Sequence, residues 1–190
     1  MFKLYQKSWH SIEFSKLKIP LSNANLPGDA FYKEFYRKFN EKYQNLNQLD
    51  KNWLSLKKKS ALEIAKYLSK SKSVEILSVG AGLGIIEKKL YDLGYKNLYI
   101  QEVSETATRY CRDFIKAENI FIGTFPKCIN KDKEFDYILL GGIEYLFNDQ
   151  ELQELLSDLK KFMHEKSKII LLSWSIEEES ILFKMRSVLK

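Results

Sequence analysis

The sequence predicts an α/β protein in which a doubly wound, mostly parallel sheet of about five strands follows an N-terminal helical segment. Short apolar runs of strand length recur after residue 73, and amphipathic stretches of helix length alternate with them. The first of these runs, Val74–Val79, is too short for a helix and is followed by Gly80, which is typical of a buried strand of a parallel sheet. A length of 190 residues predicts one domain with an added segment.

Residues 1–72 are predicted to form the helical segment, which is rich in aromatic side chains. Asp29 can cap a helix that runs to about residue 43, and a second helix is expected over 53–69. On the first helix phenylalanines recur every four residues, at Phe31, Phe35 and Phe39. This aromatic face is expected to pack on the core. The alternative is that neighbouring phenols reach over an active site, so that the segment caps its acceptor side.

Three glycines, Gly80, Gly82 and Gly84, alternate with other residues directly after the first predicted strand, and a helix is predicted to follow them. Glycine is needed where φ is positive or where a ligand lies against bare backbone, and the start of a helix presents unpaired N–H groups. The turn therefore predicts a ligand site, with an ordinary tight turn as the alternative. Ile85 stands where a dinucleotide-binding turn has its third glycine, which makes a nicotinamide-dependent oxidoreductase less favoured.

The spacing Gly-x-Gly-x-Gly after a strand resembles the first motif of the class I S-adenosylmethionine-dependent methyltransferases. The resemblance continues over 73–190 and rests on the order and spacing of five predicted strands. It implies a Rossmann-like core over these residues, S-adenosylmethionine as the cofactor, and the three glycines as part of the cofactor site. Glu102 stands where the family places the acidic residue that holds both ribose hydroxyls, and Val103 follows it in the site. A carboxylate suits this task because it can accept two hydrogen bonds from a vicinal diol.

The same resemblance assigns residues to the ends of the later strands. Thr124 and Phe125 stand where the family's adenine-contacting residues lie, and Gly141, at the end of the fourth predicted strand, belongs to the cofactor site. Glu144 and Tyr145 follow that strand and are the candidate catalytic residues on the acceptor side, because open α/β sheets place ligands at the carboxyl ends of strands. The alternative for this pair is that the glutamate caps local backbone and the tyrosine packs.

The sequence departs from the family pattern in two positions and at its end. Ser78 stands two residues before Gly80, where many relatives carry an acidic residue, and Thr124 stands where an aspartate is common. A helix is expected over Glu177–Leu189, after the fifth predicted strand at Ile169–Leu172, and the family's final antiparallel hairpin is expected to be absent. These departures keep a non-catalytic binding module open as an alternative.

The reaction implied by the resemblance is the in-line displacement of a methyl group from a sulfonium. It needs no catalytic triad because the leaving group is already activated, so the protein mainly positions the acceptor and excludes water. The predicted function is methyl transfer to a small-molecule hydroxyl or amine. A nucleic-acid or protein methyltransferase is one alternative, and a non-catalytic binding module that keeps the fold is another.

Composition narrows the expected partners. The formal net charge is +6, but the lysines are scattered, so a solvated surface is expected and nucleic-acid binding is less favoured. The two cysteines, Cys111 and Cys128, form neither a metal-type cluster nor a disulfide framework, so no metal is expected. The start of the chain lacks the apolar core of a signal peptide and no stretch reaches transmembrane length, which predicts a cytoplasmic protein without a membrane partner.

Overall fold

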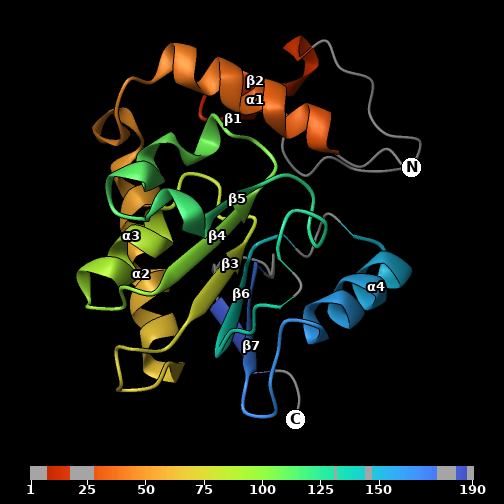
Figure 1. Cartoon of the computed structure of the whole chain (residues 1–190). Helices are drawn as coiled ribbons and strands as arrows, with labels where there is room; N and C mark the ends of the chain where they lie inside the picture. Colours follow the sequence, from red (N-terminus) through yellow and green to blue (C-terminus); the bar gives the residue numbers. More distant parts are fainter. Residues whose placement is uncertain (1–7, 18–27, 131, 144–146, 175–182, 188–190) are drawn as a thin grey trace.

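The computed structural model describes residues 8–17, 28–130, 132–143, 147–174 and 183–187 (Figure 1). Within these residues the main sheet has six strands in the order β5-β4-β3-β6-β7-β8, and the first five of that order are parallel to one another. The strands are β3 (Ile76–Val79), β4 (Leu98–Glu102), β5 (Ile120–Ile122), β6 (Tyr137–Gly141), β7 (Lys168–Trp174) and β8 (Phe183–Ser187). The chain proceeds outward from β3 in both directions, which confirms the predicted doubly wound, mostly parallel sheet.

The end of the chain differs from the prediction. Phe183–Ser187 form β8, which pairs antiparallel with β7, so the helix expected over Glu177–Leu189 is wrong at these residues, and the sheet does end in an antiparallel strand. Apolar and basic residues alternate in Phe-Lys-Met-Arg, which is the period of a strand. The free edge of β7 also offers backbone donors and acceptors that a sixth strand satisfies.

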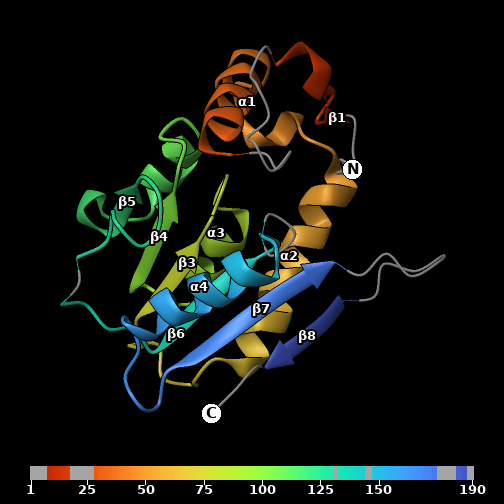
Figure 2. The ribbon, with the colours of Figure 1, turned by 90° about the vertical axis from the view of Figure 1, so that its right-hand side faces the viewer.

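Helices cover both faces of the sheet (Figures 1 and 2). On one face lie α2 (Lys51–Tyr67) and α3 (Ile85–Asp92), and on the other lies α4 (Asp149–Lys160). Successive strand residues point to opposite faces, so in β3 Ile76 packs with α2 and α3 while Leu77 packs with α4. Short 3-10 helices lie at η2 (Leu46–Gln48), η3 (Ala107–Asp113) and η4 (Ala117–Asn119).

The N-terminal part lies across one end of the sheet (Figure 1). Its described elements are β1 (Ser8–Trp9), β2 (Ile12–Glu13), η1 (Phe14–Lys16) and α1 (Asp29–Lys42). The buried residues of α1 are Phe31, Phe35, Tyr36 and Phe39. They form one cluster with Leu83 of the glycine turn, Ile85 of α3 and Ala107 of η3. The aromatic face of α1 therefore packs on the core, directly over the glycine turn.

Length and apolar character decide whether a helix in the described part of the chain could span a membrane. None of the helices in that part is both long enough and apolar enough to cross a bilayer.

Phe35→Ala is expected to lower the free energy of unfolding by about 3–5 kcal/mol, because loss of a fully buried ring leaves a cavity. Urea unfolding followed by circular dichroism measures this change. Tyr67→Ala is the matched control, since Tyr67 is 49% exposed, and it should cost less than about 0.5 kcal/mol. Equal, small effects of the two substitutions would contradict the packing of α1 on the core.

Candidate functional site

The glycine turn joins β3 to α3 in the backbone conformation that its sequence predicts. Gly80, Gly82 and Gly84 have φ values of 69°, 58° and 68°, in the left-handed region that other residues rarely adopt. The N–H of Gly80 donates to the backbone O of Gln101 at 2.9 Å and to its side-chain Oε1 at 3.1 Å. Nε2 of Gln101 donates in turn to the backbone O of Gly123 at 2.5 Å. One side chain thus ties the turn after β3 to the turn after β5.

Side chains from two other elements stand close to the first two glycines. A Cβ built on Gly82 would lie 2.7 Å from the hydroxyl oxygen of Tyr36, which belongs to α1. A Cβ built on Gly80 would lie 2.6 Å from Cγ2 of Ile143, which follows β6. Both glycines are therefore required by packing as well as by φ. This packing supports the interpretation of the motif as a tight turn, while the interpretation as a ligand site stays open.

Gly84 makes room for a cysteine in the same way. A Cβ on Gly84 would clash with Sγ of Cys111, a fully buried residue of η3. Burial raises the pKa of the Cys111 thiol far above its ordinary value, so the thiol stays neutral. Cys111 is therefore a core residue rather than a nucleophile.

The acidic residue at the end of β4 is held against the glycine turn. Glu102 is 5% exposed, and its carboxylate accepts hydrogen bonds from the N–H of Gly82 at 2.8 Å and from the N–H of Ser104 at 3.0 Å. Burial raises the pKa of Glu102, and these backbone donors offset part of that rise. A carboxylate has about four acceptor positions, so each oxygen can accept a further hydrogen bond. A vicinal diol supplies two donors, so Glu102 fits the role predicted for it.

A second buried carboxylate lies beside Ser78, where the family pattern has an acidic residue. The hydroxyl of Ser78 donates to Oε1 of Glu87 at 2.5 Å. Glu87 is 3% exposed, and no hydrogen-bond partner is found for its Oε2 among the described residues. Burial raises the pKa of this carboxyl, and the bond from Ser78 opposes the rise. Ser78 of β3 is thus paired with a buried carboxylate on α3.

The turn after β5 contacts two different parts of the chain. Thr124 donates its hydroxyl hydrogen to Oδ2 of Asp29, the first residue of α1, at 2.5 Å. The ring of Phe125 lies 5.4 Å from that of Phe162 and packs in the apolar cluster on the α4 face. The roles of Thr124 and Phe125 in contacting adenine stay predictions.

The other predicted site residues are described in part. Val103 is half-buried directly after β4. Gly141 ends β6, and among the described residues beyond its chain neighbours no atom lies within 4 Å of the position that a Cβ would take there. Glu144 and Tyr145 lie outside the described residues, so their catalytic role stays a prediction.

Sequence reasoning does not identify three residues that the structure brings to this end of the sheet. These are Asp29, Glu87 and Gln101. For Glu87 the sequence holds an indirect signal: Ser78 is a polar residue in an apolar strand, and such a residue needs a buried partner.

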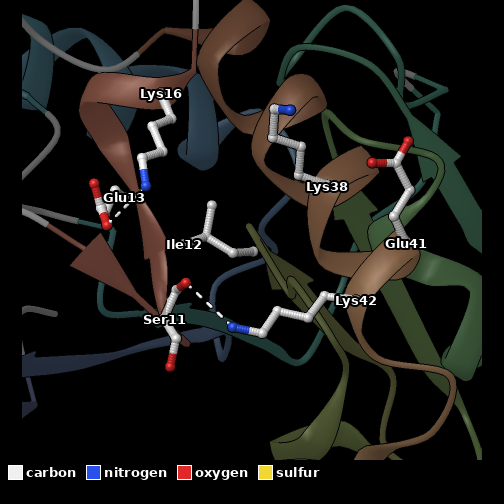
Figure 3. Close-up of a pocket in the computed structure, with 7 residues that line it drawn as sticks. All are labelled: Ser11, Ile12, Glu13, Lys16, Lys38, Glu41 and Lys42. Carbon is white, nitrogen blue, oxygen red and sulfur yellow. Dashed lines mark hydrogen bonds and ion pairs between the residues drawn. The ribbon is translucent and has the colours of Figure 1, made fainter.

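A hollow of about 350 Å³ lies elsewhere, between the β1–β2 hairpin and α1 (Figure 3). Its lining residues are Ser11, Ile12, Glu13, Lys16, Lys38, Glu41 and Lys42. Its charged groups are partly satisfied from within: Nζ of Lys16 lies 3.0 Å from Oε1 of Glu13, and Nζ of Lys42 donates to the backbone O of Ser11 at 3.2 Å. Of the predicted site residues that the structure describes, none lines this hollow.

Similar folds are found among solved structures. The PH0226 protein from Pyrococcus horikoshii OT3 is 22% identical, with a TM-score of 0.59 over 77% of this chain and 64% of that protein. A SAM dependent methyltransferase from Archaeoglobus fulgidus is 19% identical, with a TM-score of 0.55 over 75% of this chain and 59% of that protein. The glycopeptide N-methyltransferase MtfA, solved with (S)-adenosyl-L-methionine, is 18% identical, with a TM-score of 0.52 over 68% of this chain and 66% of that protein.

These similarities are similarities of fold. The chain spans less than two-thirds of the length of each of these three proteins. No protein-family model matches the sequence, and no curated protein matches it.

Glu87→Gln is expected to change how stability depends on pH. Because burial raises the folded-state pKa of Glu87 above the ordinary value of 4.5, the folded protein binds this proton more tightly than the unfolded chain does. This carboxyl therefore lowers the free energy of unfolding progressively as the pH rises above 4.5 towards the folded-state pKa. Glutamine does not titrate, so the stability of the variant relative to the wild type should improve from pH 5 to pH 8.

Urea unfolding at each pH measures this difference. The exposed Glu154→Gln serves as the control and should show no such trend. A difference between Glu87→Gln and wild type that is the same at both pH values would contradict the raised pKa.

Proposed function

We propose that this chain, which has the fold of the class I S-adenosylmethionine-dependent methyltransferases, binds S-adenosylmethionine at the carboxyl ends of β3, β4 and β5 and transfers its methyl group. The observation that carries the proposal is the hydrogen bond between the buried carboxylate of Glu102 and the N–H of Gly82. It brings an acceptor for a ribose diol together with a bare backbone turn at the point where the strand order reverses.

The residues of this chain have distinct roles in the proposal. Glu102 accepts hydrogen bonds from the ribose hydroxyls, and the glycine turn and the first N–H groups of α3 receive the carboxylate end of the cofactor. When bound, S-adenosylmethionine supplies a methyl group on a positively charged sulfonium. The aromatic face of α1 packs over the turn and excludes water from that side. Glu144 and Tyr145 position the acceptor.

The proposed acceptor is a small-molecule hydroxyl or amine. The similarity to a protein named as a glycopeptide N-methyltransferase supports methyl transfer to a compound rather than to a nucleic acid. The scattered lysines support it too, because a nucleic-acid enzyme usually concentrates positive charge on one face. A nucleic-acid acceptor would instead give binding that weakens steeply with salt.

A second candidate is a non-catalytic binding module that keeps the fold. The close approach of Tyr36 to Gly82 and of Ile143 to Gly80 favours it, because these side chains account for the first two glycines without any ligand. In that case the turn serves to seat α1 and the loop after β6.

Calorimetric titration with S-adenosylmethionine and S-adenosylhomocysteine tests the proposal, with NAD as the negative control. Glu102→Ala should weaken binding of both by about 10- to 100-fold, since a hydrogen bond to a charged group contributes about 1.5–3 kcal/mol. Glu105→Ala is the matched control, because the Glu105 side chain lies three positions along the chain and is 72% exposed. Circular dichroism checks that each variant is folded.

Either of two results would contradict the proposal. One is a wild-type protein that binds neither compound, which would favour the non-catalytic module. The other is a folded Glu102→Ala variant that binds them as tightly as the wild type does.

The affinity for S-adenosylhomocysteine is expected to rise with pH. Only the ionised carboxylate of Glu102 accepts both ribose hydroxyls, and burial raises its pKa above the ordinary 4.5. Binding should therefore weaken on acidification at a pH above the ordinary pKa of an exposed glutamate. Titrations between pH 5 and 8 measure this, and Glu102→Gln should bind weakly with no such dependence. If the affinity of the wild type and that of Glu102→Gln depended equally on pH, the dependence would come from another titratable group.

A further inference from the structure

The first residue of α1 brings a carboxylate to the carboxyl end of β5. Asp29 accepts the hydroxyl hydrogen of Thr124 on Oδ2 at 2.5 Å, although the two residues are 95 positions apart. Asp29 is half-buried, and Thr124 lies in the turn after β5. Both views show α1 lying across the end of the sheet (Figures 1 and 2). The contact therefore places an N-terminal side chain at the strand next to the one that ends in Glu102.

The negative charges of Asp29 and Glu102 interact. Burial is the main cause of the raised pKa of Glu102, and the negative charge of Asp29 adds to it. The adjacent strands β3, β4 and β5 thus end in three different chemical groups: a glycine turn, the Glu102 carboxylate, and the Asp29–Thr124 pair.

The three parts of a nucleoside cofactor, its 5′ substituent, ribose and base, match the order of these three groups. This assignment rests on the proposed function. A ribose held by Glu102, on the middle strand, carries its base on one side and its 5′ substituent on the other. The glycine turn and the start of α3 suit the anionic end of the 5′ substituent. The base is then directed towards β5. Adenine presents an exocyclic amine there, and an amine needs an acceptor.

We propose that Asp29 recognises the adenine base of the cofactor, and that Thr124 is the positioning residue that orients its carboxylate. One carboxylate oxygen is held by the Thr124 hydroxyl, and the other accepts a hydrogen bond from the exocyclic amine. Hypoxanthine has a carbonyl oxygen in place of this amine. The carboxylate and this carbonyl oxygen are both acceptors and repel each other, so the site disfavours hypoxanthine.

Two ligands that differ only in the base, adenine in one and hypoxanthine in the other, test the inference. Calorimetry is used to compare S-adenosylhomocysteine with S-inosylhomocysteine on the wild type and on Asp29→Asn. The wild type should prefer the adenine ligand by about 100-fold or more. Asp29→Asn should lose about tenfold or more for that ligand and should narrow or reverse the preference, because the asparagine amide can turn its NH₂ towards the carbonyl oxygen.

Two further variants separate recognition from folding. Thr124→Val should weaken binding of the adenine ligand less than Asp29→Asn does and should keep the direction of the preference. Asp149→Asn is the matched control, because Asp149 is also the first residue of an α-helix and its removal costs the same favourable charge at a helix start. It should leave both affinities unchanged.

Three outcomes would overturn the inference. If Asp29→Asn retains wild-type affinity and preference, Asp29 does not read the base, and the proposed function stands. If Asp29→Asn weakens both ligands by the same factor, Asp29 only holds α1 in place. If the wild type binds neither ligand, the proposed function fails together with the inference.

Discussion

The carboxylate of Glu102 joins the two strand ends on which the site depends. It is buried, and removal of a carboxylate from water is costly unless donors replace the lost hydration. The N–H of Gly82 at 2.8 Å and the N–H of Ser104 at 3.0 Å supply those donors. The left-handed φ of 58° at Gly82 directs its N–H towards β4. The same hydrogen bond therefore stabilises the turn and presents a carboxylate at the carboxyl end of the sheet.

The N-terminal helix and the glycine turn depend on each other. The missing side chain at Gly82 leaves space for the hydroxyl of Tyr36, so α1 packs closely over the turn. Nδ2 of Asn40 donates to the backbone O of Thr106 at 2.6 Å, which attaches the far end of α1 to the loop after β4. Asp29 attaches its first residue to Thr124. α1 is therefore part of the wall of the proposed cofactor site as well as a cover on the core.

Local patterns were sufficient to predict the five parallel strands of the sheet and the acidic end of β4. The run Val74–Val79, the three glycines and Glu102 follow one another within 29 residues, so spacing alone indicates their order. Contacts between distant segments were not predictable, because nothing in a single sequence links Asp29 to Thr124. Glu87 lies on a short helix among charged residues, and only its tertiary contact with Ser78 reveals burial. The helix predicted over Phe183–Ser187 is wrong because these residues pair with β7. The free edge of β7 exists only in the folded sheet, so a local sequence pattern does not reveal it.

A crystal structure of the protein with S-adenosylhomocysteine would test most directly the claim that Glu102 holds a nucleoside against the glycine turn. The predicted result has both ribose hydroxyls within hydrogen-bond distance of the Glu102 carboxylate, and the base next to the turn after β5. A ligand bound elsewhere on the protein, with Glu102 contacting only Gly82 and Ser104, would contradict the claim. The glycines would then serve only to pack α1, η3 and the loop after β6 on the core.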